Sequence, residues 1–152
     1  MRENMSKAYK YDYFKYGTTL LAVLIKDNYI LCLKLGDGDI LLKKNQEVIK
    51  VLPNYKKNIV DCMAEENSFE KIIYKIEKNQ NNISDIIIFS DGFENSFVNF
   101  DSMIKDINKT ILKYNKTIFS RYILENKYDK YLRKLSDNNS FDDKSIVFVN
   151  IL

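Results

Sequence analysis

The chain of 152 residues contains no histidine, only one proline, four glycines and two cysteines. Histidine supplies the general base of Ser-His-Asp and Cys-His hydrolases and is a common ligand of catalytic zinc, so its absence excludes these enzymes. Hydrolytic chemistry is then left to carboxylates, most naturally acting with a hard metal ion.

The scarcity of glycine and proline leaves no room for a flexible linker, and the length suits one domain. We therefore predict a single domain over residues 1–152, with a lead-in segment at 1–16 and a core at 17–152. Cys32 lies within an apolar run and is expected to be buried. Cys62 has no CxxC partner, so the cysteines predict neither a disulfide framework nor a zinc site.

The charged residues form no basic block. The net charge of +3 is spread over many lysines and acids, which is typical of solvated faces, and we expect no nucleic-acid partner. No apolar run is long enough to cross a bilayer, and the first residues lack the apolar core of a signal peptide. We expect a protein of the cytoplasm with no membrane partner.

Apolar runs bounded by turn signals predict most of the strands. The run TTLLAVLI at 18–25 is almost unbroken, which favours a fully buried strand, and a turn at Lys26-Asp27-Asn28 follows it. Asp-Gly within the Gly36-Asp-Gly-Asp39 turn is the favoured pair for a two-residue hairpin, so the first four strands are expected to form a meander. The predicted strands are 18–25, 29–35, 40–42, 48–52, 85–90 and 146–152.

The segment 69–78 fits two patterns. Ile72, Ile73 and Ile76 keep helical spacing, whereas Ile72, Tyr74 and Ile76 alternate as in a strand, so periodicity does not decide between them.

Amphipathic spacing predicts two helices, over 96–114 and about 119–135. Antiparallel strands with segregated helices indicate an α+β layered domain.

Three aspartates lie at the ends of predicted strands: Asp37, Asp91 and Asp142. A strand end holds a side chain rigidly while leaving it open to solvent, and carboxylate oxygens are the ligands that Mg²⁺ and Mn²⁺ prefer. Each aspartate also has a structural interpretation, as a turn residue for Asp37 and as an Asx turn for Asp142. Asp91 is the strongest candidate, because Asp-Gly there precedes a helix and not a returning hairpin strand.

Four motifs in order resemble those of the metal-dependent (type-2C, PPM) serine/threonine protein phosphatases of bacterial type. Residues 16–25 look like the Gly-Ser/Thr-Thr strand of that family, and residues 35–42 are similar to its Gly-Asp motif. IIIFSDGFENSF at 86–97 resembles the Ser/Thr-Asp-Gly motif, and FDDKSIVFV at 141–149 resembles the closing strand. Together the motifs cover residues 16–149.

The resemblance implies an incomplete four-layer sandwich of antiparallel β-sheets flanked by α-helices. It makes 69–78 a strand. It also assigns Asp91 and Asp142 to the catalytic pair of Mg²⁺ or Mn²⁺ ions, and Asp37 to a third, weaker ion. The implied reaction is hydrolysis of phosphoserine or phosphothreonine by a metal-activated water.

The sequence departs from the family in its front section. The family carries an Asp-Gly motif whose aspartate bridges both metals, and no such motif stands ahead of residue 17. Phe141 occupies a position where the family often has glycine, and Asn95 one where some members carry an acid. We therefore expect little or no phosphatase activity from this chain alone.

The partners follow from the same reasoning. Sheet edges left open by missing strands invite self-association or pairing with a complementary N-terminal fragment. A phosphoprotein or kinase partner fits the family. The alternatives are a degenerate phosphatase fold acting as a regulatory or phosphoprotein-binding module, and a small interaction domain whose motifs match by chance.

Overall fold

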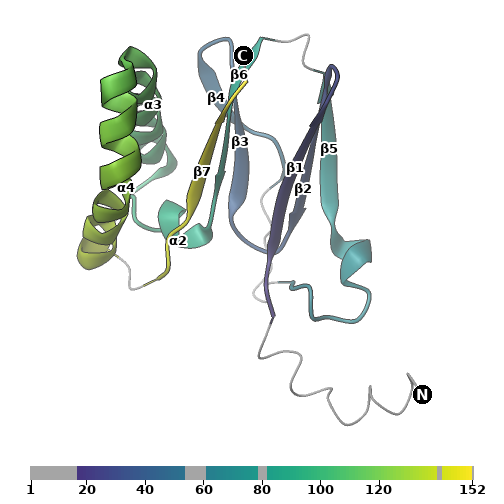
Figure 1. Cartoon of the computed structure of the whole chain (residues 1–152). Helices are drawn as coiled ribbons and strands as arrows, with labels where there is room; N and C mark the ends of the chain where they lie inside the picture. The colour runs from purple at the N-terminus through teal and green to yellow at the C-terminus, as the bar shows by residue number, and fades with distance from the viewer. Residues whose placement is uncertain (1–16, 54–60, 79–81, 140–141, 152) are drawn as a thin grey trace. The chain divides into compact units, whose positions relative to one another are not determined.

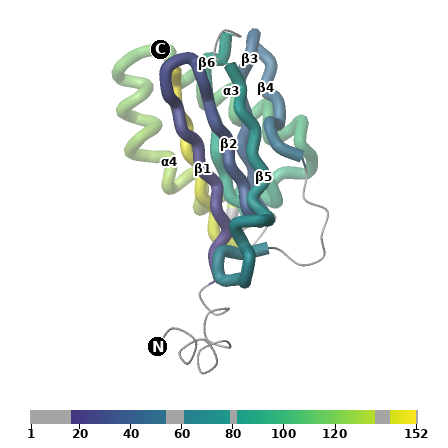
Figure 2. Tube along the Cα trace, turned by 90° about the vertical axis from the view of Figure 1, so that its right-hand side faces the viewer, coloured from purple at the N-terminus to yellow at the C-terminus, as the bar shows by residue number. Residues whose placement is uncertain are grey.

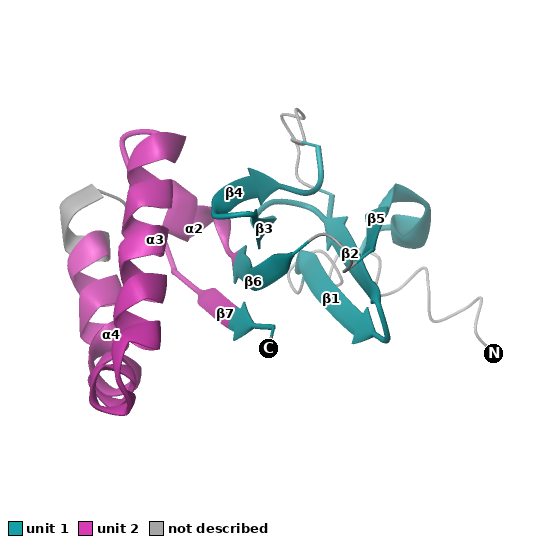
Figure 3. Ribbon diagram, turned by 90° about the horizontal axis from the view of Figure 1, so that it is seen from above, with its two compact units in different colours: residues 1–88, 149–152 teal, residues 89–148 magenta. Residues whose placement is uncertain are grey.

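The computed structural model describes residues 17–53, 61–78, 82–139 and 142–151. The chain divides into two compact units, coloured separately in Figure 3. The sheet unit comprises Met1–Ile88 and Val149–Leu152, and the helical unit comprises Phe89–Phe148. The predicted lead-in at 1–16 lies outside the described residues. The assignment of the whole chain to a single domain stays a prediction.

Two antiparallel sheets account for the strands. The first has the order β1-β2-β5, which Figure 2 shows side by side, and the second has the order β4-β3-β6-β7. The boundaries of the six strands predicted from apolar runs agree with the observed ones to within two residues. The strands are β1 (Leu20–Lys26), β2 (Tyr29–Leu35), β3 (Asp39–Lys44), β4 (Glu47–Lys50), β5 (Ile73–Lys78), β6 (Ile83–Phe89) and β7 (Ile146–Asn150).

The core of the sheet unit lies between its two sheets, which face each other in Figure 1. Ile30 and Cys32 of β2 pack in one buried cluster with Ile40 and Leu42 of β3 and Ile86 of β6. Alternation along each strand places these side chains on the inner faces. Cys32 is buried as predicted, and this burial raises the pKa of its thiol to about 11. The negative charge of Glu77 adds to the rise, and the positive charge of Lys75 opposes it. The thiol therefore stays protonated and is a poor nucleophile.

The first predicted strand is not fully buried. Leu24 and Ile25, near the end of the edge strand β1, are 57% and 43% exposed. Leu24 lies on the outer face, which the described residues leave uncovered, whereas Ile25 shares the inner face with its pairing partner Ile30. A continuous apolar run reports hydrophobicity on both faces of a strand, and it does not report whether both faces are covered. β6 carries a similar run and is buried along nearly all of its length.

The predicted turn after β1 is confirmed, and the predicted hairpin after β2 is wrong. Lys26 pairs with Tyr29, so Asp27 and Asn28 form a two-residue turn. After β2, however, the chain leaves one sheet and enters the other at β3. Gly36 and Gly38 both adopt positive φ, at 87° and 77°, which turns the chain between sheets and not back along β2. The predicted meander is therefore split into two hairpins, β1-β2 and β3-β4.

Asp39 lies buried at this crossing and joins three strands. Its Oδ1 accepts a hydrogen bond from the backbone N–H of Ile40 at 2.9 Å and lies 3.8 Å from Nζ of Lys34 on β2. Its Oδ2 lies 3.0 Å from Nζ of Lys50 on β4. The side chains of Asp39 and Lys34 are almost fully buried, so each charge depends on the other for compensation.

The ambiguous segment contains both a short helix and a strand. A 3-10 turn, η2 (Ser68–Lys71), follows Asn67 in a left-handed conformation, and β5 begins two residues after the turn ends. The strand that the family resemblance implied is confirmed from Ile73 onward, where β5 pairs with β2.

The helical unit contains α2 (Asp91–Glu94), α3 (Phe100–Lys116) and α4 (Ile118–Asn139). α3 starts later than predicted, because Asn99 caps it: its side chain accepts the N–H of Ser102, and the Ser102 hydroxyl accepts the N–H of Asn99. α3 buries Met103, Ile107 and Ile111, while α4 packs the ring of Tyr128 against Phe148 of β7. No described helix is long and apolar enough to cross a bilayer.

Replacing Asp39 by asparagine is expected to lower the free energy of unfolding by about 3 kcal/mol, since it leaves the buried ammonium group of Lys34 uncompensated. Urea denaturation monitored by circular dichroism measures the change. Glu47→Gln, which removes an exposed carboxylate from the same β3-β4 hairpin, is the matched control and should shift stability by less than about 0.5 kcal/mol. Equal effects of the two changes would contradict a structural role for the buried ion pair.

Candidate functional site

Asp91 follows β6 and opens α2. The buried strand β6 sets the position of Asp91. The side-chain Oδ1 of Asp91 accepts a hydrogen bond from the N–H of Gly92 at 2.8 Å, and the backbone carbonyl of Asp91 accepts one from the N–H of Asn95 at 2.8 Å. The side chain stays partly exposed. The carboxylate is therefore well positioned and still open to solvent, as expected of a ligand.

Gly92 brings a distant part of the chain against this position. A Cβ at residue 92 would collide with the carbonyl oxygen of Asp143 and lie 3.3 Å from Cβ of Asp142. Only a residue without a side chain allows this approach. The glycine of the Ser-Asp-Gly motif thus seats Asp142 and Asp143 beside Asp91, and two of the three predicted ligands come from neighbouring backbone segments.

Ser90 ties the two segments together through its backbone and its hydroxyl. Its N–H donates to the carbonyl of Ser145 at 3.0 Å, and its Oγ accepts the N–H of Ser145 at 3.0 Å. The same hydroxyl donates to the carbonyl of Asp143 at 3.4 Å. The sequence offered the serine of the motif as a signal, but no role was inferred for it, because its partners lie more than fifty positions further along the chain.

The second segment presents exposed acids. Oδ1 of Asp142 accepts the N–H of Asp143 at 3.1 Å, and Nζ of Lys144 donates to the Asp142 carbonyl at 3.0 Å. Asp142 and Asp143 are exposed, so their oxygens face solvent. Gathering carboxylates costs electrostatic repulsion, and a divalent cation relieves it.

The two neighbouring aspartates fit a hydrated divalent ion. Mg²⁺ is often held through one or two carboxylates while keeping several waters, and Asp91 with Asp142 can supply that number. Within the described ranges, however, no cluster of three or more acidic, cysteine or histidine side chains is arranged to hold a metal. Asp37 belongs to the sheet unit, partly exposed between two glycines, and its role as a ligand stays a prediction.

Two further motifs meet within the sheet unit. A Cβ at Gly36 would lie 2.7 Å from the carbonyl oxygen of Asp61 and would also collide with the side chain of Thr19. The Gly-Thr-Thr strand and the Gly-Asp turn are therefore packed against each other. Asp61, which the sequence did not single out, is buried there and pairs with Nζ of Lys71 at 2.8 Å.

The family model of protein phosphatase 2C matches residues 2–133. The chain belongs to this family. The matched range contains Asp37 and Asp91 and ends before Asp142.

Solved phosphatases share the fold of the chain. A bacterial serine phosphatase carrying a single arginine substitution is 18% identical, with a TM-score of 0.64, over 98% of this chain and 65% of its own. The serine/threonine phosphatase Stp1 from Staphylococcus aureus is 15% identical, with a TM-score of 0.60, over 98% of this chain and 66% of its own. The catalytic domain of PstP, solved with two manganese ions, is 15% identical, with a TM-score of 0.56, over 87% of this chain and 57% of its own.

The chain spans about two thirds of the length of the bacterial phosphatases it resembles. No curated protein matches it in sequence. The predicted α+β fold, with two antiparallel sheets and helices as in the phosphatase 2C family, is confirmed.

Replacing Ser90 by alanine is expected to lower the free energy of unfolding by about 1–2 kcal/mol, because the N–H of Ser145 loses its acceptor. Ser145→Ala is the matched control, since that residue contributes backbone groups to the tie. Denaturation curves of the two variants measure the difference. If Ser90→Ala were no less stable than Ser145→Ala, the hydroxyl would not join the two segments.

Proposed function

We propose that the chain is a metal-dependent serine/threonine phosphatase domain of the protein phosphatase 2C family, acting on phosphoserine or phosphothreonine in the cytoplasm. One observation carries the proposal: Gly92 seats Asp142 and Asp143 directly beside Asp91. Family membership supports it, and so does the solved PstP catalytic domain with its two manganese ions.

The aspartates would hold Mg²⁺ or Mn²⁺. A divalent cation in such a site lowers the pKa of a bound water and offsets the charge of a phosphoryl group. The bond from Gly92 orients the Asp91 carboxylate, and the ties from Ser90 to Asp143 and Ser145 would keep Asp142 near the same ion. No side chain needs to act as covalent nucleophile, which agrees with the protonated, buried thiol of Cys32.

We further propose that the activity of this chain alone is low. Two carboxylates hold one side of an ion, and the sequence contains no match to the Asp-Gly motif whose aspartate bridges the two metals in the family. Without the bridge the two-metal clamp on the phosphoryl group is not complete.

A second candidate function rests on the same observation. A phosphatase fold with an incomplete ligand set can serve as a regulatory module that binds a phosphoprotein, with a protein kinase or its substrate as partner. The lack of a group of three ligands within the described part of the chain favours this alternative over full catalysis.

Replacing Asp91 by asparagine is expected to weaken Mn²⁺ binding about tenfold or more. Mutating a residue that only hydrogen-bonds to a metal ligand already lowers affinity by about that factor, and loss of a ligand should cost at least as much. Water proton relaxation in the presence of Mn²⁺ measures the affinity. Asp101→Asn, which removes an exposed carboxylate from α3, is the matched control and should leave binding unchanged.

The same proteins test activity through hydrolysis of a phosphoserine peptide with Mn²⁺. We expect turnover close to background. Robust turnover that Asp91→Asn abolishes would contradict low activity. Mn²⁺ binding unaffected by Asp91→Asn would contradict the assigned ligand and with it the proposed function.

We also propose self-association through the outer face of the β1-β2-β5 sheet. Leu24, Leu31 and Ile76 pair across its three strands in one row, opposite to the core face. Leu24 and Ile76 are 57% and 58% exposed, and Tyr74 on the same edge strand is exposed as well. A contiguous apolar sheet face of this kind favours a protein interface, either with a second copy or with a complementary N-terminal fragment.

Ile76→Lys is expected to shift the chain from a dimer toward a monomer, because a charge in an apolar interface must be desolvated. Sedimentation velocity at increasing concentration measures the change. Leu112→Lys, at an exposed apolar residue of α3 in the other unit, is the matched control and should leave the dimer intact. A wild-type chain that stays monomeric at high concentration would contradict self-association.

A further inference from the structure

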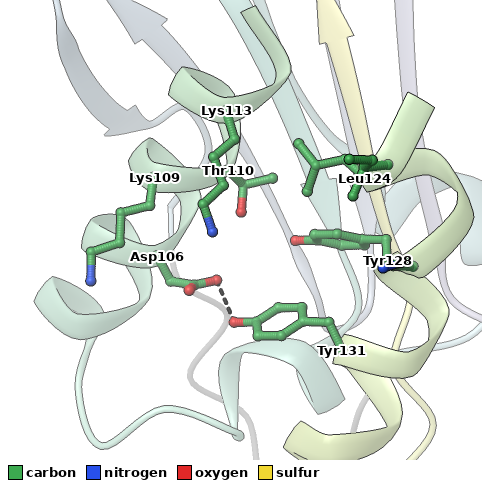
Figure 4. A pocket seen from close by; sticks show the side chains of 9 residues that line it. Asp106, Lys109, Thr110, Lys113, Leu124, Tyr128 and Tyr131 are labelled. Atoms are coloured by element: carbon green, nitrogen blue, oxygen red, sulfur yellow. Dashed lines mark hydrogen bonds between the residues drawn. The ribbon is translucent and has the colours of Figure 1, made fainter. Parts of the chain in front are cut away.

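The helical unit contains a pocket of about 190 Å³ between α3 and α4 (Figure 4). A water molecule takes about 30 Å³ in the liquid, so the pocket has room for a small organic molecule. Its lining combines an apolar wall with several polar side chains directed toward the same space. The side chains used below are Asp106, Lys109, Thr110 and Lys113 of α3 and Leu124, Lys127, Tyr128 and Tyr131 of α4.

Two tyrosines give the pocket a rigid side. The hydroxyl of Tyr131 donates to Oδ2 of Asp106 at 2.6 Å, which joins the two helices across the pocket. The rings of Tyr128 and Tyr131 lie 5.3 Å apart, and Phe148 supports Tyr128 from behind with a centroid distance of 5.9 Å. Leu124 adds an apolar surface on the same helix. The lining is thereby pre-organised for a flat or compact apolar group.

The hydroxyl of Tyr128 is shielded from solvent and has no hydrogen-bond partner among the described residues. In Figure 4 it points from α4 toward Thr110 and Lys113 on α3. Burial raises the pKa of this phenol to about 12; the nearby Thr110 hydroxyl, which can donate a hydrogen bond to the ionised oxygen, opposes the rise, and the charge of Asp106 adds to it. The phenol therefore stays protonated. An unpaired buried hydroxyl is unfavourable for stability, and a bound acceptor would satisfy it.

The pocket has an excess of positive charge. Lys109, Lys113 and Lys127 line it, and no ion pair with another described residue is found for any of them. The carboxylate of Asp106 already accepts the hydrogen bond from Tyr131. In Figure 4 the ammonium group of Lys113 points between the two helices, and that of Lys109 points away. The lining nevertheless holds three lysines and one aspartate, a balance that suits an anion.

We propose that this pocket binds a small phosphate monoester that carries a compact apolar or aromatic group. A phosphate monoester has a charge of about −1.5 to −2 at neutral pH and several acceptor oxygens, which suit the lysines and the Tyr128 hydroxyl. Its organic group would lie against Leu124 and the tyrosine rings. The inference does not depend on the metal-binding aspartates, because none of them lines the pocket.

Titration with phenyl phosphate in the presence of EDTA tests the proposal on the full chain. EDTA removes divalent ions, so any metal centre at Asp91 contributes neither binding nor hydrolysis. Isothermal calorimetry should show saturable binding of phenyl phosphate, tighter than binding of inorganic phosphate, which lacks the organic group.

Three variants separate this pocket from general charge effects. Tyr128→Phe should weaken binding roughly tenfold through the lost hydrogen bond to a charged oxygen, without lowering Tm, because it removes an unpaired polar group. Lys113→Gln with Lys127→Gln should weaken binding by a similar factor. Lys105→Gln with Lys130→Gln changes the net charge equally on the same helices, outside the lining, and should have little effect.

The absence of saturable binding up to about 10 mM phenyl phosphate would overturn the proposal, since affinity weaker than that has no use for a specific site. Equal loss of affinity in the two double variants would overturn it as well, because binding would then reflect net charge. Binding unchanged by Tyr128→Phe would overturn it too, because the phosphate would then make no hydrogen bond to the buried hydroxyl. None of these results bears on the phosphatase assignment, which the Mn²⁺ measurements test.

Discussion

A buried carboxylate organises the sheet unit. Asp39 stands where the chain leaves the β1-β2-β5 sheet for the β3-containing sheet, and it is compensated by Lys34 from one sheet and Lys50 from the other. A charge buried in this way is strongly unfavourable unless its partners are in place. The ion pair therefore favours one connection between the sheets over the hairpin that the Asp-Gly pair would otherwise form. The positive φ of Gly36 and Gly38 makes the crossing sterically possible.

The candidate site depends on a close approach of a different kind. Gly92 permits backbone atoms of Asp143 to lie where a side chain would otherwise stand, and the Ser90 hydroxyl fixes the two segments with bonds to both sides. The result is that Asp91 and Asp142 become neighbours with exposed oxygens. In general, two carboxylates suffice to hold one hydrated divalent ion, whereas a two-metal reaction needs more ligands.

The helical unit has two polar regions of opposite character. The aspartate segments gather negative charge, whereas the pocket between α3 and α4 is lined by three lysines and a protonated phenol. A buried hydroxyl without a hydrogen-bond partner lowers the stability of the fold, and a bound ligand that accepts its hydrogen bond would offset this loss. Both regions are built from pairs of segments held together by a specific hydrogen bond, Ser90 to Ser145 in one and Tyr131 to Asp106 in the other.

Local patterns by themselves determined the class of the fold, most strands and both long helices, because hydrophobic period and turn residues act over a few positions. The order of the motifs at 86–97 and 141–149 also indicated Asp91 and Asp142 as companions. Tertiary structure alone decided the rest. Whether β1 is covered, which sheet β3 joins, how Asp39 is compensated and why Ser90 matters are set by groups far apart in the chain. An apolar run looks the same whether one or both of its faces are buried, and an aspartate looks the same with or without a lysine beside it in space.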